Sequence, residues 1–280
     1  MIEIRNLTKK FDNFTAVDSL NLKIETGEFF GLLGPNGAGK TTTISLLSTL
    51  LLPSQGEILI DGQILNRNRP DLKRKISVIT QEYSMRQDMN MDEIMEYQGR
   101  LYFMPKKEIR RRTEELLEFC DLLKFRKRTV RKLSGGMKRK LMVCRALLTD
   151  PEILLLDEPT AGMDALSRRQ MWNLLRQLND KNLTILLTTH YMEEAQSLCG
   201  RVALMDHGKL EEVSSPSALI ESLGSYAVDE PSPAGTRSHY FHTRQEAIDY
   251  LSGLSGQASL RETTLEDVFV ERAGSHLSPS

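Results

Sequence analysis

Eight residues at positions 34–41 have the composition and spacing of a loop that binds phosphate. They match the pattern G-x-x-x-x-G-K-[ST] at every fixed position, between a predicted strand and a predicted helix. Glycines let backbone N–H groups curl round a phosphate, and the N-terminus of the following helix adds positive potential. Lys40 is expected to reach the β- and γ-phosphates, and the Thr41 hydroxyl to ligate Mg²⁺. The predicted nucleotide contacts of this loop are Gly34, Pro35, Asn36, Gly37, Ala38, Gly39, Lys40, Thr41 and Thr42.

Two adjacent carboxylates, Asp157 and Glu158, follow the apolar run 153–156. Such a run predicts a buried strand, and in open α/β sheets ligands bind beyond the carboxyl ends of the strands. Asp157 is therefore predicted to ligate the magnesium beside the loop, and Glu158 to polarise the attacking water. Many ordinary strands also end in an acidic turn, so the prediction depends on the phosphate-binding loop.

A third motif precedes these carboxylates: Leu133, Ser134, Gly135, Gly136 and Met137, followed by a basic helical run. A serine cap and two glycines at a helix N-terminus make an anion site. With this motif the chain resembles the ATP-binding cassette (ABC) family over residues 1–220. The resemblance implies that Ser134, Gly135 and Gly136 contact the γ-phosphate of an ATP held by a second subunit.

The same resemblance assigns roles to further positions. Phe11 stands where the family has the aromatic residue that stacks on adenine, although Phe14 is close by and a core position is the alternative for Phe11. Gln81 resembles the glutamine that touches Mg²⁺ and the attacking water and that senses a permease. Asp164 stands in the place of the loop between subunits, and His190 resembles the histidine that contacts the γ-phosphate.

The third motif departs from the family's commonest form at its fifth residue, where Met137 replaces glutamine. Methionine cannot donate an amide hydrogen bond, so we expect altered nucleotide contacts rather than lost activity. Met137 and the tail segment 264–270 resemble the branch of the family that exports drugs, polysaccharides and lipids through separate permeases. The resemblance therefore implies an exporter.

The hydrophobic pattern predicts the elements that must position these motifs. Residues 1–25 alternate as short strands do, and further on helices and strands alternate, which predicts an α/β fold with a largely parallel sheet covered on both faces. The resemblance implies a P-loop NTPase core with an antiparallel β subdomain, a helical subdomain at about 86–145 and a small α+β appendage. The predicted strands cover 28–33, 57–60, 76–80, 153–156, 184–188 and 202–205, and the predicted helices 42–52, 91–124, 166–178 and 192–198.

The composition changes beyond Glu221. Residues 225–237 predict a linker or loop, because serine, proline and glycine are frequent there. Two helices of a small appendage are predicted to follow, one opened by a capping box at 243–246 and one after Thr264. The predicted domains are an ABC ATPase domain at 1–221 and the linker with its appendage at 222–280.

Composition and charge exclude several classes of protein. Lys and Arg number 37 against 38 Asp and Glu, which argues against a chain held on nucleic acid by its global charge. Three widely spaced cysteines fit a reducing compartment and lack the spacing of a zinc site. No apolar run approaches the ~18–20 residues that span a bilayer, and residues 1–5 do not have the pattern of a signal peptide. We expect a cytoplasmic protein, peripheral on the cytoplasmic face of the cell membrane.

The expected assembly is a head-to-tail homodimer that sandwiches two ATP molecules and drives a separate transmembrane permease. The excess of Lys and Arg at 105–145 is interpreted as a solvated helical face, or as a surface for anionic lipid or an acidic permease loop. A soluble ABC ATPase with a role outside transport is the alternative function. A P-loop kinase would leave residues 133–137 and His190 unexplained.

Overall fold

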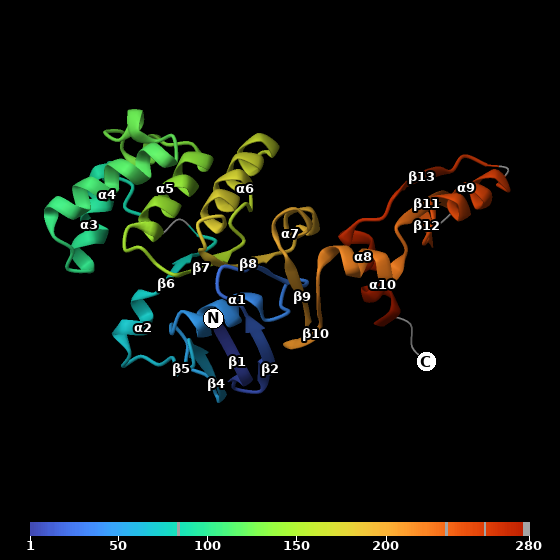
Figure 1. Ribbon diagram of the computed structural model, residues 1–280, viewed down its shortest axis with the longest axis horizontal. Coiled ribbons are helices and arrows are strands. Elements are labelled where there is room, and N and C mark those ends of the chain that lie inside the picture. Colours follow the sequence, from blue (N-terminus) through green and yellow to red (C-terminus); the bar gives the residue numbers. More distant parts are fainter. Residues whose placement is uncertain (83–84, 233–234, 255, 277–280) are drawn as a thin grey trace. The chain divides into compact units, whose positions relative to one another are not determined.

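The chain forms two compact units in the computed structural model, which describes residues 1–82, 85–232, 235–254 and 256–276 (Figure 1). The first unit comprises Met1–His190 and Ala203–Glu212, and the second comprises Tyr191–Val202 and Val213–Ser280. The segment Tyr191–Val202 thus belongs to the second unit, whereas the domain boundary predicted from composition lies after residue 221. That boundary stays a prediction.

The main sheet of the first unit has six strands, in the order β10-β9-β3-β8-β7-β6. The pairs β3–β8, β8–β7 and β7–β6 are parallel, which confirms the predicted parallel sheet. Strands β3, β7 and β8 are buried along their whole length, as expected for strands covered on both faces. Their bounds are β3 (Phe29–Leu33), β6 (Ile76–Ile79), β7 (Ile153–Asp157), β8 (Thr184–Thr189), β9 (Arg201–Asp206) and β10 (Lys209–Ser214).

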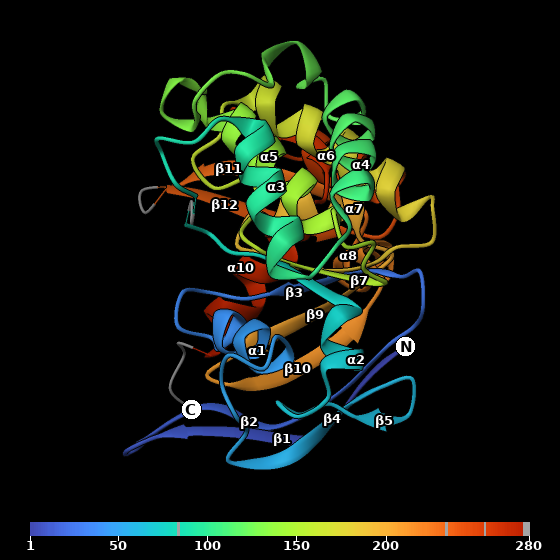
Figure 2. The same cartoon turned by 90° about the vertical axis from the view of Figure 1, so that its left-hand side faces the viewer.

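A second sheet of this unit has the order β2-β1-β4-β5, and its pairs β1–β2, β1–β4 and β4–β5 are antiparallel. It is the antiparallel subdomain that the resemblance implied. Its strands are β1 (Ile2–Phe11), β2 (Phe14–Ile24), β4 (Gln55–Ile60) and β5 (Gln63–Ile64). Figures 1 and 2 show this sheet and α1 (Lys40–Leu47) on one side of the six-stranded sheet, and α3 to α6 on the other.

Helix α1 is shorter than the predicted helix at 42–52. It ends at Leu47, and Thr49 takes a left-handed conformation with φ 61°, which a helix interior does not allow. The apolar periodicity predicted a helix to residue 52 because Leu50 and Leu52 are apolar. Both side chains are exposed, so they are not part of a buried helix face.

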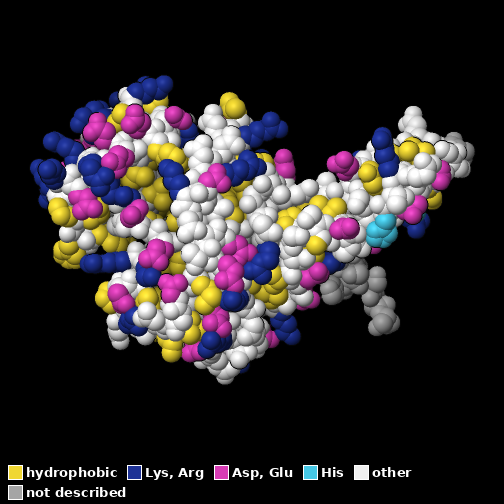
Figure 3. Space-filling view, viewed as in Figure 1, with side chains coloured by type: hydrophobic (Ala, Val, Ile, Leu, Met, Phe, Trp, Pro, Cys, Tyr) yellow, Lys and Arg dark blue, Asp and Glu magenta, His cyan; other side chains and the backbone are white. Residues whose placement is uncertain are grey.

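The helical subdomain contains α3, α4 and α5, and Figure 3 shows many Lys and Arg side chains gathered over it. No strand was expected at 91–124, and the structure has helices and a short 3₁₀ turn there. The helices of the first unit outside α1 are α2 (Pro70–Arg74), α3 (Met91–Leu101), α4 (Lys106–Phe119), α5 (Gly135–Leu147) and α6 (Ala165–Asn179), with 3₁₀ turns at Leu123–Phe125 and Val130–Lys132.

The second unit contains a three-stranded antiparallel sheet in the order β12-β11-β13, covered by α9. Helix α10 packs on α7 and α8. The capping box at Thr243 and Glu246 is present, and Thr264 caps α10 by accepting the N–H of Asp267. The elements are α7 (Met192–Leu198), α8 (Pro216–Leu223), β11 (Tyr226–Ser232), β12 (Gly235–Phe241), α9 (Arg244–Ser252), β13 (Ser259–Glu262) and α10 (Leu265–His276).

The linker predicted at 225–237 is wrong. The described residues of this segment belong mainly to β11 and β12, which pair from Tyr226↔Phe241 to Ser232↔Gly235, while Pro233 lies outside the described residues. Pro231 is tolerated because β13 pairs with β11 only as far as Asp229, so no ladder bond on that side requires an N–H at Pro231.

Within the described ranges, no helix has the length and apolar character that crossing a membrane requires.

Candidate nucleotide site

The loop at 34–41 connects β3 to α1, as the motif requires. Gly39 precedes α1 with φ 105°, and Gly37 has φ 84°. A Cβ at Gly39 would lie 2.4 Å from the carbonyl oxygen of Ala16, and one at Gly34 would lie 2.1 Å from that of Met205. Both glycines are needed because the loop runs against neighbouring backbone.

Lys40 is buried, and its amine lies within the loop. Nζ donates to the carbonyl oxygens of Gly34 at 2.7 Å and Pro35 at 2.9 Å. Burial lowers the pKa of Lys40, while the nearby carboxylates of Glu158 and Asp157 act in the opposite direction. The amine is therefore held beside the loop's backbone, where a nucleotide phosphate would be cradled.

Asp157 ends β7 and is buried next to two hydroxyl groups. Its Oδ1 accepts from Thr188 Oγ1 at 2.6 Å and from Thr41 Oγ1 at 3.2 Å. Hydroxyl and carboxylate oxygens are ligands that Mg²⁺ prefers, so the donor set formed by Thr41 and Asp157 fits that ion. Thr188 was not predicted as part of the site; the signal for it was a polar residue at the end of the buried strand β8, which lies opposite Asp157 in register.

Glu158 is flanked by the two other predicted catalytic residues. Nδ1 of His190 lies 3.1 Å from Oε1 of Glu158, and Nε2 of Gln81 donates to Oε2 at 3.4 Å. Glu158 itself has φ 47°, a left-handed conformation that is uncommon outside glycine. The structure therefore brings the three residues together beyond the carboxyl ends of β6, β7 and β8.

A cavity of about 540 Å³ collects these groups. Of the two phenylalanines considered for adenine stacking, Phe14 is among the described residues that line it and Phe11 is not. Phe14 is 61% exposed, whereas Phe11 is 41% exposed and has Lys9 Nζ 5.0 Å from its ring centroid. The lining residues are Phe14, Ala16, Asn36, Gly37, Gly39, Lys40, Thr41, Thr42, Gln81, Glu158 and His190.

Ser134, Gly136 and Met137 line a different cavity, of about 350 Å³. Ser134 caps α5 by accepting the N–H of Met137 at 3.3 Å, which confirms the predicted serine cap. This second cavity shares no described lining residue with the first. One chain therefore does not bring its phosphate-binding loop and its Ser-Gly-Gly motif to the same cavity.

Asp164 caps the neighbouring helix α6. Its carboxylate accepts from the N–H and from the hydroxyl of Ser167, both at 2.8 Å, and the backbone hydrogen bond from Ser167 lowers the pKa of Asp164. Ser167 also borders the second cavity, and a Cβ on Gly136 would lie 3.2 Å from its hydroxyl oxygen. Asp164 thus lies beside the Ser-Gly-Gly motif rather than at the loop.

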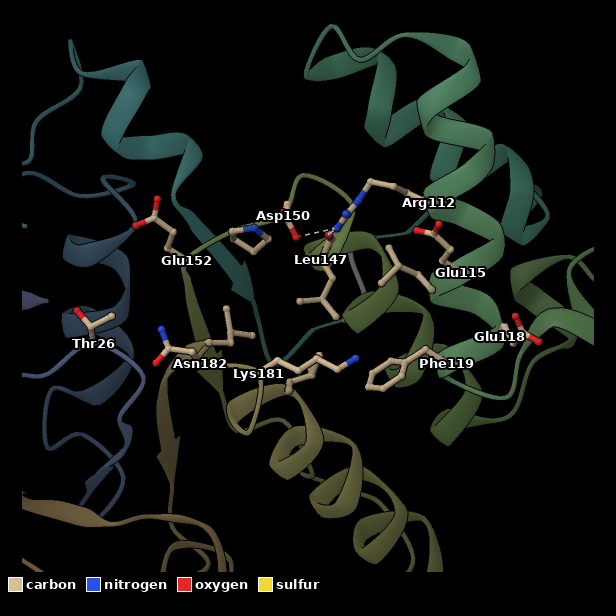
Figure 4. A pocket seen from close by; sticks show the side chains of 14 residues that line it. Thr26, Arg112, Glu115, Glu118, Phe119, Leu147, Asp150, Glu152, Lys181 and Asn182 are labelled. Carbon is tan, nitrogen blue, oxygen red and sulfur yellow. Dashed lines mark hydrogen bonds and ion pairs between the residues drawn. The ribbon is translucent and has the colours of Figure 1, made fainter.

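A larger cavity, of about 860 Å³, lies apart from both motifs. Figure 4 shows Arg112 reaching Asp150 across it, while Lys181 points toward Phe119. Its described lining contains neither the loop at 34–41 nor the carboxylates that follow β7. Size alone therefore does not identify the nucleotide site in this fold.

Comparison with known proteins gives consistent matches. Residues 17–161 match the family described as ABC transporter. The chain is 36% identical to the Nod factor export ATP-binding protein I of Cupriavidus metallidurans, over 98% of this chain and 97% of that protein. It is 34% identical to the linearmycin resistance ATP-binding protein of Bacillus subtilis, over 84% and 76% of the two chains.

Solved structures match as well. A dimeric bacterial ABC transporter cassette has a TM-score of 0.69 and 28% identity over 77% of this chain and 98% of that one. An ATP-binding subunit of an ABC transporter has a TM-score of 0.74 over 98% of this chain and 99% of that one, at 22% identity. The second match supports the fold alone, and it extends over the C-terminal unit.

Proposed function

This chain belongs to the ABC transporter family, and we propose that it powers export through a separate permease by binding and hydrolysing ATP between two copies of itself. The observation that carries the proposal is the placement of the motifs. The phosphate-binding loop, Gln81, Glu158 and His190 share one cavity, whereas Ser134 and Gly136 line another. The alternative of an ABC ATPase outside transport is not favoured, because the relatives that match nearly the whole chain are named as export proteins.

The proposed hydrolysis uses a water molecule that attacks the γ-phosphorus. Glu158 takes the proton of that water on a carboxylate oxygen, and ADP leaves with the oxygen that bridged the β- and γ-phosphorus atoms. Thr41 and Asp157 would hold Mg²⁺, with Gln81 close by, and the bound ion would offset the negative charge of the phosphates. His190 and Gln81 orient the Glu158 carboxylate through the hydrogen bonds described above.

The second copy completes the site. A head-to-tail dimer would place Ser134, Gly135 and Gly136 of one protomer on the γ-phosphate that the other protomer's loop holds. The N-terminus of α5 suits this role, because Ser134 precedes the helix and its first backbone N–H groups attract anions. Two of the solved relatives are described as dimeric cassettes, which supports the formation of a dimer.

A groove on the first unit is suited to the permease. It has a volume of about 440 Å³ and is lined by the exposed apolar side chains of Leu50, Leu101 and Phe103. The basic residues Lys73 and Arg74 also line it. Phe103 is 87% exposed. The groove also includes Val78 of β6, the strand that leads to Gln81, so a permease segment there would lie close to the catalytic groups. The protein would then be peripheral on the cytoplasmic face of the membrane.

The proposal is tested with purified protein, ATP and Mg²⁺, without any phosphate acceptor. We expect release of inorganic phosphate, with an activity per protomer that rises with protein concentration as dimers form. A constant activity per protomer down to high dilution would contradict the shared site. Phosphate transfer that requires an added acceptor would instead indicate a kinase.

A further inference from the structure

Arg139 is a charged side chain in the core of the first unit. It lies on α5, five positions after the capping residue Ser134, and it is 1% exposed. Burying a guanidinium is costly unless its donors are satisfied, and well-packed apolar residues often replace buried charges without loss of stability. Packing alone therefore does not account for an arginine at this position.

The guanidinium bridges α5 to the segment that follows β6. Nη1 of Arg139 donates to the carbonyl oxygen of Thr80 at 2.8 Å, and Nη2 donates to that of Gln81 at 3.1 Å. The planar fork of an arginine suits two neighbouring acceptors, and a lysine cannot reproduce this geometry. One side chain thus fixes two successive carbonyl groups of the backbone that presents Gln81.

Gln81 continues the connection to the catalytic carboxylate, because its side chain donates to Glu158 at 3.4 Å. The contacts run from the N-terminus of α5, through Arg139 and the Gln81 backbone, to Glu158. Resting on the proposed function, we propose that Arg139 is a positioning residue that couples the Ser-Gly-Gly motif of a protomer to the Gln81–Glu158 pair of the same protomer. Binding of the partner's nucleotide at Ser134 then influences how Glu158 is oriented.

Arg112 provides a matched control in the same subdomain. Its guanidinium also donates to two successive carbonyl oxygens, those of Leu147 and Leu148, and it pairs with Asp150 at 3.0 Å. These contacts lie at the C-terminal end of α5, away from the Gln81 segment. Arg112→Lys therefore removes the same kind of interaction without touching the proposed connection.

The test is a double-mutant cycle on the rate of ATP hydrolysis in the full-length protein. Arg139→Lys is expected to lower kcat about 10-fold in the wild-type background and less than about 2-fold in a Gln81→Ala background. Arg112→Lys is expected to have the same effect in both backgrounds. If Arg139→Lys does not yield folded protein, Arg139→Gln takes its place, because its amide can still donate to one of the two carbonyls.

The outcomes separate the two proposals. An effect of Arg139→Lys that shrinks in the Gln81→Ala background supports the coupling. An equal effect in both backgrounds, or no effect in the wild type, overturns it and leaves hydrolysis by the dimer intact as a proposal. If the ATPase activity per protomer of the unaltered protein does not depend on protein concentration, the proposed function is overturned, and the coupling with it.

Discussion

His190 and Glu158 lie at the ends of neighbouring strands, with Nδ1 and Oε1 3.1 Å apart. The register of β7 and β8 sets this distance. Asp157 lies opposite Thr188, Glu158 is the next residue after Asp157, and His190 comes two residues after Thr188. The carboxylate that we assign as the base is thus oriented by a side chain from the adjacent strand.

Replacing the base tests its role directly. Glu158→Gln keeps the size of the side chain but cannot take a proton, so we expect turnover to fall at least ~100-fold. ATP should remain bound and hold the dimer together, which can be followed by light scattering after gel filtration. Glu152→Gln, an exposed acid elsewhere in the unit, serves as the control. Near-wild-type turnover of Glu158→Gln would remove Glu158 as the base.

The two phenylalanines give a matched pair for the adenine contact. Stacking of a base on an aromatic ring is worth ~1–3 kcal/mol, so Phe14→Ala should raise the KM for ATP about 5-fold or more. Phe11→Ala should change KM little, since Phe14 lines the cavity and Phe11 does not. Steady-state kinetics over a range of ATP concentrations measures both, and the reverse result would restore Phe11 to the role expected from the family.

Mixing two inactive variants tests the shared site. Lys40→Ala removes a phosphate contact of the loop, and Ser134→Arg blocks the motif that faces the partner. Random pairing makes half of the dimers mixed, each with one intact site of two, so the mixture should recover about a quarter of the wild-type rate. No recovery would contradict a head-to-tail arrangement.

Removal of Mg²⁺ should separate binding from hydrolysis. With EDTA, ATP is still expected to bind through the loop and Lys40, but phosphate release should stop. Asp157→Asn should weaken the response to added Mg²⁺, which titration of the rate against the free metal concentration measures. Full activity in EDTA would exclude the assignment of Thr41 and Asp157 as metal ligands.

The second unit should show a specific dependence of stability on pH. Arg261 forms 2.7 Å ion pairs with Asp229 and Asp267. Its hydrogen bonds lower the pKa of Asp229; for Asp267, burial raises the pKa but the hydrogen bonds from Arg261 and Thr264 outweigh it and the net direction is downward. The contribution to stability is therefore present above the carboxyls' ordinary pKa and is lost as the pH falls through their lower folded values.

Arg261→Met should thus destabilise the unit by about 1–3 kcal/mol near pH 7 and by less as the pH falls below about 4. Denaturant unfolding at several pH values, followed by a probe in the second unit, measures the difference. Arg237→Met, at an exposed position on β12, is the control. A difference that does not change with pH would contradict this account.

The sequence predicts the local backbone geometry of the site better than it predicts the surrounding structure. The loop and the carboxylates after β7 were identifiable because each depends on local backbone geometry. Which of Phe11 and Phe14 lines the cavity was not predictable, because it depends on how the turn between β1 and β2 meets the cavity. The hairpin of β11 and β12 was missed because Pro231 and its serine neighbours also suit a loop, and because its pairing with β13 is distant in sequence.

Arg139 was overlooked for a related reason. Lys and Arg are frequent around it, and a basic helix is usually solvated on its charged face. Only the packing of α5 against β6 shows that this arginine points inward.

Helix α5 is held at both ends by side chains: Ser134 caps its first turn, and Arg112 binds its last carbonyl groups. With 13 residues it is about 20 Å long. Both ends of the helix thus have side-chain partners for backbone groups that a helix terminus otherwise leaves unpaired. Opening of either terminal turn must therefore break side-chain contacts as well as helical hydrogen bonds, so we expect the amides at both ends of α5 to exchange slowly with solvent.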